Sequence, residues 1–196
     1  KALNKGIEQC SNEIIARMDS DDISMPDRME RQLEAMEANR ADILSGTIVE
    51  FDESVDKPTA KRELPEKNEQ IIEFAKKRSP FNHPAVMFKK SDVIKAGSYM
   101  DFHGFEDYYL WLRMLSGGMK GYNLSEVLVY MRVGNGMYAR RGGVSYLKDM
   151  AEFRKIMLNS GYINLLEFLT SVITRGIVIL MPANLRKTVY SVFLRK

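Results

Sequence analysis

Residues 14–22, Ile14-Ile15-Ala16-Arg17-Met18-Asp19-Ser20-Asp21-Asp22, form a short apolar run that ends abruptly in three carboxylates. A run of this length is compatible with a buried β-strand. The acidic residues then stand at the carboxyl end of the strand, which is where open α/β sheets bind their ligands. In an extended chain, Asp19 and Asp21 project to the same side, and Asp22 projects to the other unless the chain has already turned.

Three clustered carboxylates suggest a cation site. Oxygen ligands suit Mg²⁺ or Mn²⁺, which proteins hold with one or two carboxylates together with substrate phosphates. The same cluster also fits a solvated acidic loop that precedes the next helix. From these residues alone both interpretations stay open.

The composition is that of an ordinary globular protein. The chain has 196 residues, 45% of them hydrophobic and 28% charged, which predicts one sizeable core. A net charge of +3 is too small to indicate a nucleic-acid partner, and no groove-reading motif occurs. The lone Cys10 excludes an intramolecular disulfide, and no apolar run is long enough to span a bilayer. We therefore expect a cytoplasmic location, either in solution or peripheral on the inner face of the plasma membrane.

Helical and extended patterns alternate along the chain. After the acidic cluster, apolar residues at helical spacing predict a helix that packs its methionines into the core, and Ser24 with Asp27 resembles its capping box. The apolar positions of that helix are Met25, Met29, Leu33 and Met36. Residues 42–51 and 127–133 predict strands, residues 52–62 a polar loop, and residues 65–78 and 106–115 helices.

Glu106 and Asp107 open the last of these helices. Negative charge in the first turn is stabilised by the helix dipole, so a purely structural role explains both acids. A catalytic role is the alternative.

The chain is predicted to divide into a domain of residues 1–145 and a helical region of residues 146–196. Residues 165–196 mix aliphatic side chains with Arg175, Arg186, Lys187, Arg195 and Lys196. A basic amphipathic segment of this kind can lie on an anionic membrane. Packing against a preceding part of the protein explains the pattern equally well.

The order of these features resembles the family 2 glycosyltransferases of the GT-A fold. Residues 14–22 look like the stretch that leads into the family's metal-binding DXD motif, and residues 26–32 resemble the helix that follows it. Residues 82–88, Asn-His-Pro-Ala-Val-Met-Phe, look like the acceptor-side segment, and residues 104–113 contain the ED motif. Arg140-Arg141-Gly142-Gly143 fits the closing segment. The resemblance implies an α/β fold with a mixed sheet flanked by helices, part of it Rossmann-like.

The resemblance also implies roles for individual residues. Asp21 or Asp22 would ligate Mn²⁺ or Mg²⁺, and Asp19 would lie nearer the donor's ribose and the waters of the metal. Arg140 and Arg141 could close over the diphosphate, because guanidinium groups match phosphate geometry. An exposed basic loop is the alternative for these two arginines.

On the acceptor side, the resemblance makes Asp107 the base that deprotonates the acceptor hydroxyl, with Glu106 orienting or binding the acceptor. Asn82 and His83 would contact the acceptor or the diphosphate. A lone histidine is also often a structural residue, and both roles stay open for His83.

The implied activity is an inverting transfer of a sugar from a nucleotide-diphosphate sugar, such as a UDP-hexose, to a hydroxyl group of a saccharide or lipid-linked acceptor. Bacterial surface polysaccharide synthesis is the expected setting. Family members begin with a Rossmann-like β-α-β portion that holds the nucleotide base, and this sequence starts after it. We therefore expect the chain alone to bind its donor poorly, and near-native affinity by calorimetry would contradict this.

Two alternative functions differ from sugar transfer in their chemistry. One is a noncatalytic fragment or scaffold that binds a partner or a membrane surface. The other is a phosphatase of the haloacid-dehalogenase type, which also begins with a strand and Asp-x-Asp. It is disfavoured because Asp22-Ile23 follows here where Gly-Thr is usual.

Overall fold

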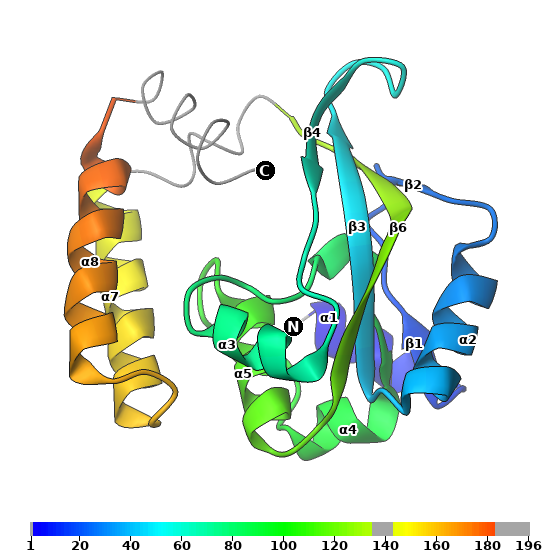
Figure 1. Ribbon diagram of the computed structural model, residues 1–196, viewed down its shortest axis with the longest axis horizontal. Coiled ribbons are helices and arrows are strands. Elements are labelled where there is room, and N and C mark those ends of the chain that lie inside the picture. Colours follow the sequence, from blue (N-terminus) through cyan, green and yellow to red (C-terminus); the bar gives the residue numbers. More distant parts are fainter. Residues whose placement is uncertain (1, 135–142, 183–196) are drawn as a thin grey trace. The chain divides into compact units, whose positions relative to one another are not determined.

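The computed structural model describes residues 2–134 and 143–182 (Figure 1). The chain divides into two compact units. The first contains residues 1–50 and 61–132, and the second contains residues 51–60 and 133–196. The predicted boundary between residues 145 and 146 stays a prediction.

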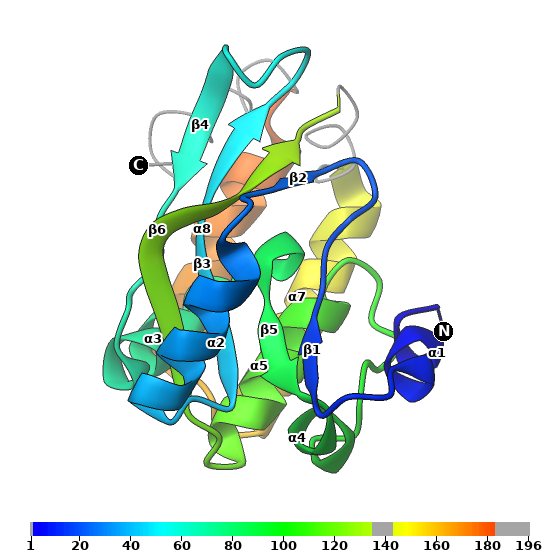
Figure 2. The same cartoon turned by 90° about the vertical axis from the view of Figure 1, so that its right-hand side faces the viewer.

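A mixed sheet organises the described residues up to Arg132 (Figure 2). The strand order is β1 (Ile14–Ala16), β5 (Met87–Lys89), β3 (Ile43–Phe51), β6 (Gly121–Arg132) and β2 (Ile23–Ser24), and β4 (Pro58–Arg62) pairs with β3. Strand β5 is antiparallel to both of its neighbours, and its Phe88 lies opposite Ile15 on β1 and opposite Ile43 on β3. Strands β1 and β3 therefore run in the same direction.

Strand β1 is shorter and less buried than its apolar sequence predicts. It spans three residues, of which Ile15 is the buried one, because β1 is at the edge of the sheet and pairs on one side only, with β5. The prediction that the acidic cluster follows a strand is nevertheless confirmed.

Helices cover both faces of the sheet (Figure 1). Met87 packs with Ala35 and Met36 of helix α2 on one face. The next residue, Phe88, places its ring 6.3 Å from that of Trp111 in helix α5, on the other face. The helical segments are α1 (Ala2–Gln9), α2 (Arg28–Asn39), α3 (Asn68–Ala75), the 3₁₀ turn η1 (His83–Ala85), α4 (Lys90–Lys95), α5 (Glu106–Ser116), α7 (Gly143–Asn159) and α8 (Leu165–Leu180).

The inward face of α2 differs from the predicted methionine stripe. Met29 and Leu33 are 41% and 46% exposed, whereas Arg28 and Gln32 are buried. These two polar side chains are tolerated inside because they donate hydrogen bonds to backbone carbonyls of neighbouring segments. The predicted capping box of Ser24 and Asp27 is also absent, because Ser24 belongs to β2 and the helix begins only at Arg28, with Asp27 as an N-cap that makes no side-chain cap hydrogen bond.

Other elements also differ from the prediction. Helix α3 spans Asn68–Ala75, whereas residues 65–78 were predicted to be helical. Strand β6 begins at Gly121, six residues before the predicted start. The predicted polar loop of residues 52–62 contains β4, whose polar sequence is tolerated because this strand is mostly exposed. The helix predicted at residues 106–115 is confirmed as α5.

Gly46 allows β3 and β6 to approach closely. A Cβ atom at this position would lie 2.5 Å from Leu128 Cδ1 and 3.1 Å from the Leu124 carbonyl oxygen. We expect Gly46→Ala to lower the free energy of unfolding by about 1–3 kcal/mol, because the fully buried Leu128 has little room to move. Urea denaturation measures this. Gly6→Ala in α1, where no atom lies within 4 Å, is the control and should be neutral or slightly stabilising.

Helices α7 and α8 of the second unit pack against each other. Met150, Phe153 and Met157 are buried on α7, and a capping box between Asn164 and Glu167 starts α8. The outward side of α8 carries exposed aliphatic side chains at helical spacing, namely Leu166, Leu169, Ile173, Ile177 and Leu180. Among the described residues, none of the helices has both the length and the apolar character needed to cross a membrane.

Candidate functional site

The acidic cluster lies in a turn directly after β1. The Asp22 amide donates to the Asp19 carbonyl oxygen over 3.4 Å, so the chain has turned before Asp22. Asp22 is therefore 7% exposed, whereas Asp21 is exposed. Asp22 Oδ1 accepts a hydrogen bond of 2.8 Å from the Arg132 amide at the end of β6.

The second carboxylate oxygen of Asp22, Oδ2, indicates which kind of ligand the site can bind. Oδ2 is buried and has no hydrogen-bond partner among the described residues. Burial raises the pKa of Asp22, and the negative charges of Asp19 and Asp21 raise it further. A buried carboxylate oxygen without a donor, surrounded by like charge, is satisfied best by a cation.

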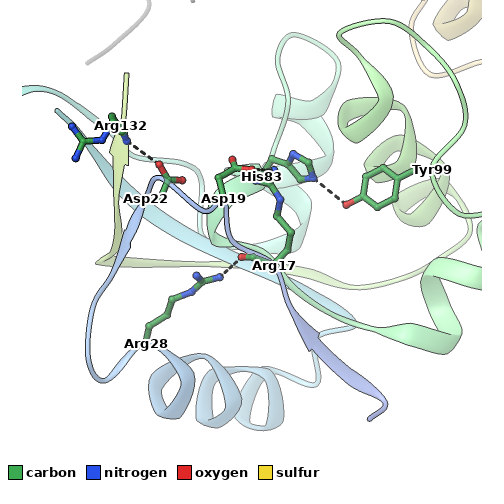
Figure 3. A network of polar contacts seen from close by, with 7 residues as sticks. All are labelled: Arg17, Asp19, Asp22, Arg28, His83, Tyr99 and Arg132. Carbon is green, nitrogen blue, oxygen red and sulfur yellow. Dashed lines mark hydrogen bonds and ion pairs between the residues drawn. The ribbon is translucent and has the colours of Figure 1, made fainter. Parts of the chain in front are cut away.

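Helix α2 holds the end of β1 in place (Figure 3). Arg28 Nη2 donates to the carbonyl oxygens of Arg17, at 2.8 Å, and Val86, at 3.4 Å. Arg28 Nε donates to Gln32 Oε1 at 2.7 Å, and Gln32 donates to the Ala85 carbonyl at 2.8 Å. Burial lowers the pKa of Arg28 to about 10. The helix thereby links the strand before the acidic cluster to η1 and β5.

Asn82 is fully buried and holds the start of η1 against β3. Its side-chain amide donates to the carbonyl oxygens of Gly46, at 2.8 Å, and Arg62, at 3.2 Å. Its backbone amide donates to Ser45 Oγ at 3.1 Å. These bonds fix the backbone directly before His83, and the predicted contact of Asn82 with the acceptor or the diphosphate stays a prediction.

His83 lies between the acidic cluster and α5 (Figure 3). Its Nε2 is 3.1 Å from the Tyr99 hydroxyl oxygen, and its ring centroid is 6.1 Å from that of Trp111. Burial lowers the pKa of His83 to about 4 against the opposing effect of the Asp107 charge, and Arg17 and Asp19 also act on this ring. The DXD and ED segments therefore act electrostatically on a single side chain.

Tyr99 is fixed by an asparagine of α1. Asn4 Nδ2 donates to the Tyr99 carbonyl oxygen at 2.9 Å, and Asn4 Oδ1 accepts from the Tyr99 amide at 3.0 Å. Burial and the charge of Asp107 raise the pKa of Tyr99. The hydroxyl group is therefore a neutral hydrogen-bond partner for His83.

The ED pair occupies the first turn of α5. Both side chains are partly exposed, and Glu106 Oε2 is buried without a hydrogen-bond partner among the described residues. Trp111, one turn further along, is fully buried and packs edge-on against Phe81 at 5.9 Å between centroids. This helix therefore presents its acids at the site and buries its aromatic face.

Some site residues were not predicted, and others lie outside the described part. Arg17 has one sequence signal, a cation directly before the acidic cluster. Arg28 and Tyr99 have none, because helical spacing puts Arg28 on the polar side of α2 and Tyr99 is in a loop. Arg140 and Arg141 lie outside the described residues.

The acidic cluster fits a divalent ion in part. Among the described residues no three His, Cys, Asp or Glu side chains converge on one point. Asp22 offers a buried free oxygen, and Asp19 and Asp21 offer more exposed ones. Mg²⁺ and Mn²⁺ sites of this kind are completed by phosphate oxygens and water, so these residues fit an ion bound together with a diphosphate.

The lowered pKa of His83 predicts a pH dependence of stability. As pH falls, the unfolded chain binds a proton near the ordinary pKa of 6.5, whereas folded His83 binds one only near 4. The stability that neutral His83 provides is thus complete above pH 6.5 and is lost as pH falls towards 4. His83→Gln should flatten the dependence over this range in urea denaturation series. His103→Gln, at an exposed histidine, is the control, and an equal flattening there would contradict the assignment.

Comparison with known proteins identifies the family. The model of the family described as glycosyl transferase family 2 matches residues 1–99, which include the acidic cluster, Asn82 and His83. An amylovoran biosynthesis glycosyltransferase of Erwinia amylovora is 42% identical over 195 residues, covering 97% of this chain and 71% of the relative. An Escherichia coli UDP-Gal:alpha-D-GlcNAc-diphosphoundecaprenol beta-1,3-galactosyltransferase is 37% identical over 196 residues, covering 100% and 71%.

Solved structures have the same fold. TarS of S. aureus in complex with UDP-GlcNAc superposes with a TM-score of 0.61 at 14% identity, covering 98% of this chain and 55% of that one. The mannosyltransferase PcManGT of Pyrobaculum calidifontis in complex with GDP-Man and Mn²⁺ gives 0.55 at 14% identity, covering 100% and 59%. The chain thus spans little more than half of these structures. It belongs to glycosyl transferase family 2, and its fold is of the GT-A type.

Proposed function

We propose that this chain is the catalytic part of an inverting, metal-dependent glycosyltransferase. It would transfer a sugar from a nucleotide-diphosphate sugar, such as a UDP-hexose, to a hydroxyl group of a saccharide or lipid-linked acceptor in bacterial surface polysaccharide synthesis. The names of the two relatives support this setting, since one acts in amylovoran biosynthesis and the other uses UDP-Gal and a diphosphoundecaprenol-linked sugar.

The observation that carries the proposal is that two acidic motifs, far apart in sequence, come from elements that meet at the same histidine. Asp19 lies beside His83 (Figure 3), and the His83 ring packs 6.1 Å from that of Trp111 in α5, the helix whose first turn contains Asp107. Asp19 precedes His83 by more than sixty residues, and Asp107 follows it in another element, yet both charges act on its ring. A transferase needs one site for the leaving diphosphate and one for the attacking hydroxyl, and this arrangement supports the proposal that both are close to His83.

On the donor side, Asp22 would hold the ion with its free Oδ2, helped by Asp19 or Asp21. A divalent ion there supplies Lewis-acid stabilisation of the leaving diphosphate. The Arg132 amide keeps Asp22 turned inward by binding its other oxygen. Arg140 and Arg141 remain proposed diphosphate contacts.

On the acceptor side, Asp107 would accept the proton of the attacking hydroxyl group, and Glu106 would bind or orient the acceptor through its free Oε2. Attack from the face opposite the leaving diphosphate gives inversion. Neutral His83, held by Tyr99, would separate the two carboxylate groups and contact the acceptor or the diphosphate. Asn82 would position His83.

The test is a panel of nucleotide-sugars with the full-length protein, measuring Mn²⁺- or Mg²⁺-dependent release of nucleoside diphosphate. Release from one donor, dependent on the metal, is the expected result and identifies the sugar. If folded protein releases nothing with any donor, with or without saccharide and lipid-linked acceptors, the scaffold becomes the better explanation.

We also propose that α8 contacts the membrane surface that carries a lipid-linked acceptor. The exposed aliphatic side chains of α8 are followed by a sequence rich in Arg and Lys, and residues 168–196 contain no Asp or Glu. Flotation with anionic liposomes should recover the protein, and truncation of residues 165–196 should abolish recovery. Equal recovery after truncation would remove the membrane contact and leave packing within the protein.

A further inference from the structure

Arg17 is at the centre of the charges in this site. Its Nη2 forms an ion pair with Asp19 Oδ1. Its charge also acts on Asp22, on His83 and on Tyr99. These groups come from the turn after β1, from η1 and from the loop before α5. Figure 3 shows the Arg17 side chain extending from the end of β1 towards Asp19 and His83.

The backbone of Arg17 is held, whereas its guanidinium group is only partly engaged. The Arg17 amide donates to the Val86 carbonyl at 2.9 Å, and its carbonyl accepts from Arg28 at 2.8 Å. Nη1 has no hydrogen-bond partner among the described residues. Because the backbone of Arg17 is held and its Nη1 group is unused, the guanidinium group can change hydrogen-bond partners without a movement of β1.

The Arg17–Asp19 pair is easily exchanged. The Arg17 side chain is 16% exposed, but that of Asp19 is 45% exposed. An ion pair with so accessible a carboxylate contributes little free energy. A divalent ion that enters the acidic cluster therefore competes for Asp19 at little cost.

When a diphosphate binds beside the three aspartates, its negative charge needs a cationic side chain that can reorient towards it. Arg17 pairs with Asp19 and its charge acts on Asp22, and the charge of Arg28 also acts on Asp22. A diphosphate adds more negative charge. Arg28 is 1% exposed and holds backbone carbonyls, so Arg17 is the one of the two that can reach a bound ligand.

We propose that Arg17 is a donor-site residue that exchanges partners: it pairs with Asp19 in the metal-free protein and turns to the donor diphosphate when the divalent ion takes up Asp19. This inference rests on the proposed function. It assigns Arg17 two opposite effects, since it weakens binding of the metal alone and strengthens binding of the diphosphate.

The test uses the full-length protein and two probes. Free Mn²⁺ is followed by electron paramagnetic resonance as protein is added, and UDP is titrated by calorimetry at saturating Mn²⁺. Arg17→Met should tighten binding of Mn²⁺ alone by about three- to tenfold, because a competing cation is gone. It should weaken UDP binding by about tenfold or more. Arg17→Lys, which keeps the charge but not the two-pronged geometry, should restore Mn²⁺ affinity to the original value and UDP affinity only in part.

Arg31→Met is the matched control, because Arg31 forms an exposed ion pair of 2.6 Å with Asp27, the N-cap residue of α2. It should change both affinities by less than about twofold. Thermal unfolding followed by circular dichroism verifies that each variant is folded. If folded Arg17→Met weakens both probes together, or changes neither, the partner exchange is wrong.

Asp22→Asn separates this inference from the proposed function. If Asp22→Asn leaves Mn²⁺ binding intact, the metal site itself is wrong. If Asp22→Asn abolishes Mn²⁺ binding but Arg17→Met does not tighten it, the metal site stands and the role of Arg17 fails alone.

Discussion

Asp22→Asn in the full-length protein is expected to lower metal-dependent release of nucleoside diphosphate by about 100-fold or more, because a metal ion contributes several kcal/mol to stabilisation of the leaving group. Asp22 is the acid of the cluster that is both buried and left with a free oxygen. An amide at this position can still accept the hydrogen bond from the Arg132 backbone, so the turn should keep its conformation.

The stability of this variant distinguishes a metal ligand from a structural residue. Burial and two neighbouring carboxylates raise the pKa of Asp22, so its charge is a cost to the folded protein at neutral pH. The Asp22→Asn variant, which is neutral at this position, should therefore unfold at the same or a higher urea concentration while losing activity. Asp27→Asn is the control and should retain activity. Activity retained in Asp22→Asn would remove Asp22 from the metal site.

The second large effect is expected on turnover in the Asp107→Asn variant. We expect turnover to fall by about 100- to 10,000-fold, the usual contribution of a general base. Donor affinity should stay within about twofold, because Asp107 is proposed to act on the acceptor hydroxyl, and an interaction made only in the transition state does not change ground-state binding. Steady-state kinetics and calorimetry with the donor measure the two quantities.

Two controls make the assignment specific. Glu106→Gln should raise the KM for the acceptor more than it lowers turnover, because Glu106 is proposed to bind the acceptor. Asp101→Asn, at an exposed loop position, should be near neutral. If Asp107→Asn loses turnover and donor affinity equally, Asp107 is a stabilising residue at the start of α5 instead of the base.

The order of elements was largely readable because it depends on local patterns. The apolar run before the acidic cluster, and the acids that open α5, are signals within a few residues of one another. Helix α5 matches its predicted range closely for this reason. The polar strand β4 was missed because its residues are mostly exposed and carry no apolar alternation.

The spacing of apolar residues could not show which face of α2 is buried. Helical periodicity indicates that Met29 and Leu33 share a face, but it does not say which face the sheet covers. The carbonyl oxygens of Arg17, Val86 and Ala85 decide this, because they need donors in the interior and Arg28 and Gln32 supply them.

For this protein, then, the amino-acid sequence by itself determined that one group of acids follows a strand and that another begins a helix. Only the tertiary structure decided that Asp22 is buried while Asp21 is exposed, and that His83 is surrounded by the charges of Arg17, Asp19 and Asp107. The physical reason is the distance along the chain over which each interaction acts. Capping, periodicity and dipole effects act within one or two turns, whereas burial and the electrostatic environment of a site arise from segments that folding brings together from distant parts of the chain.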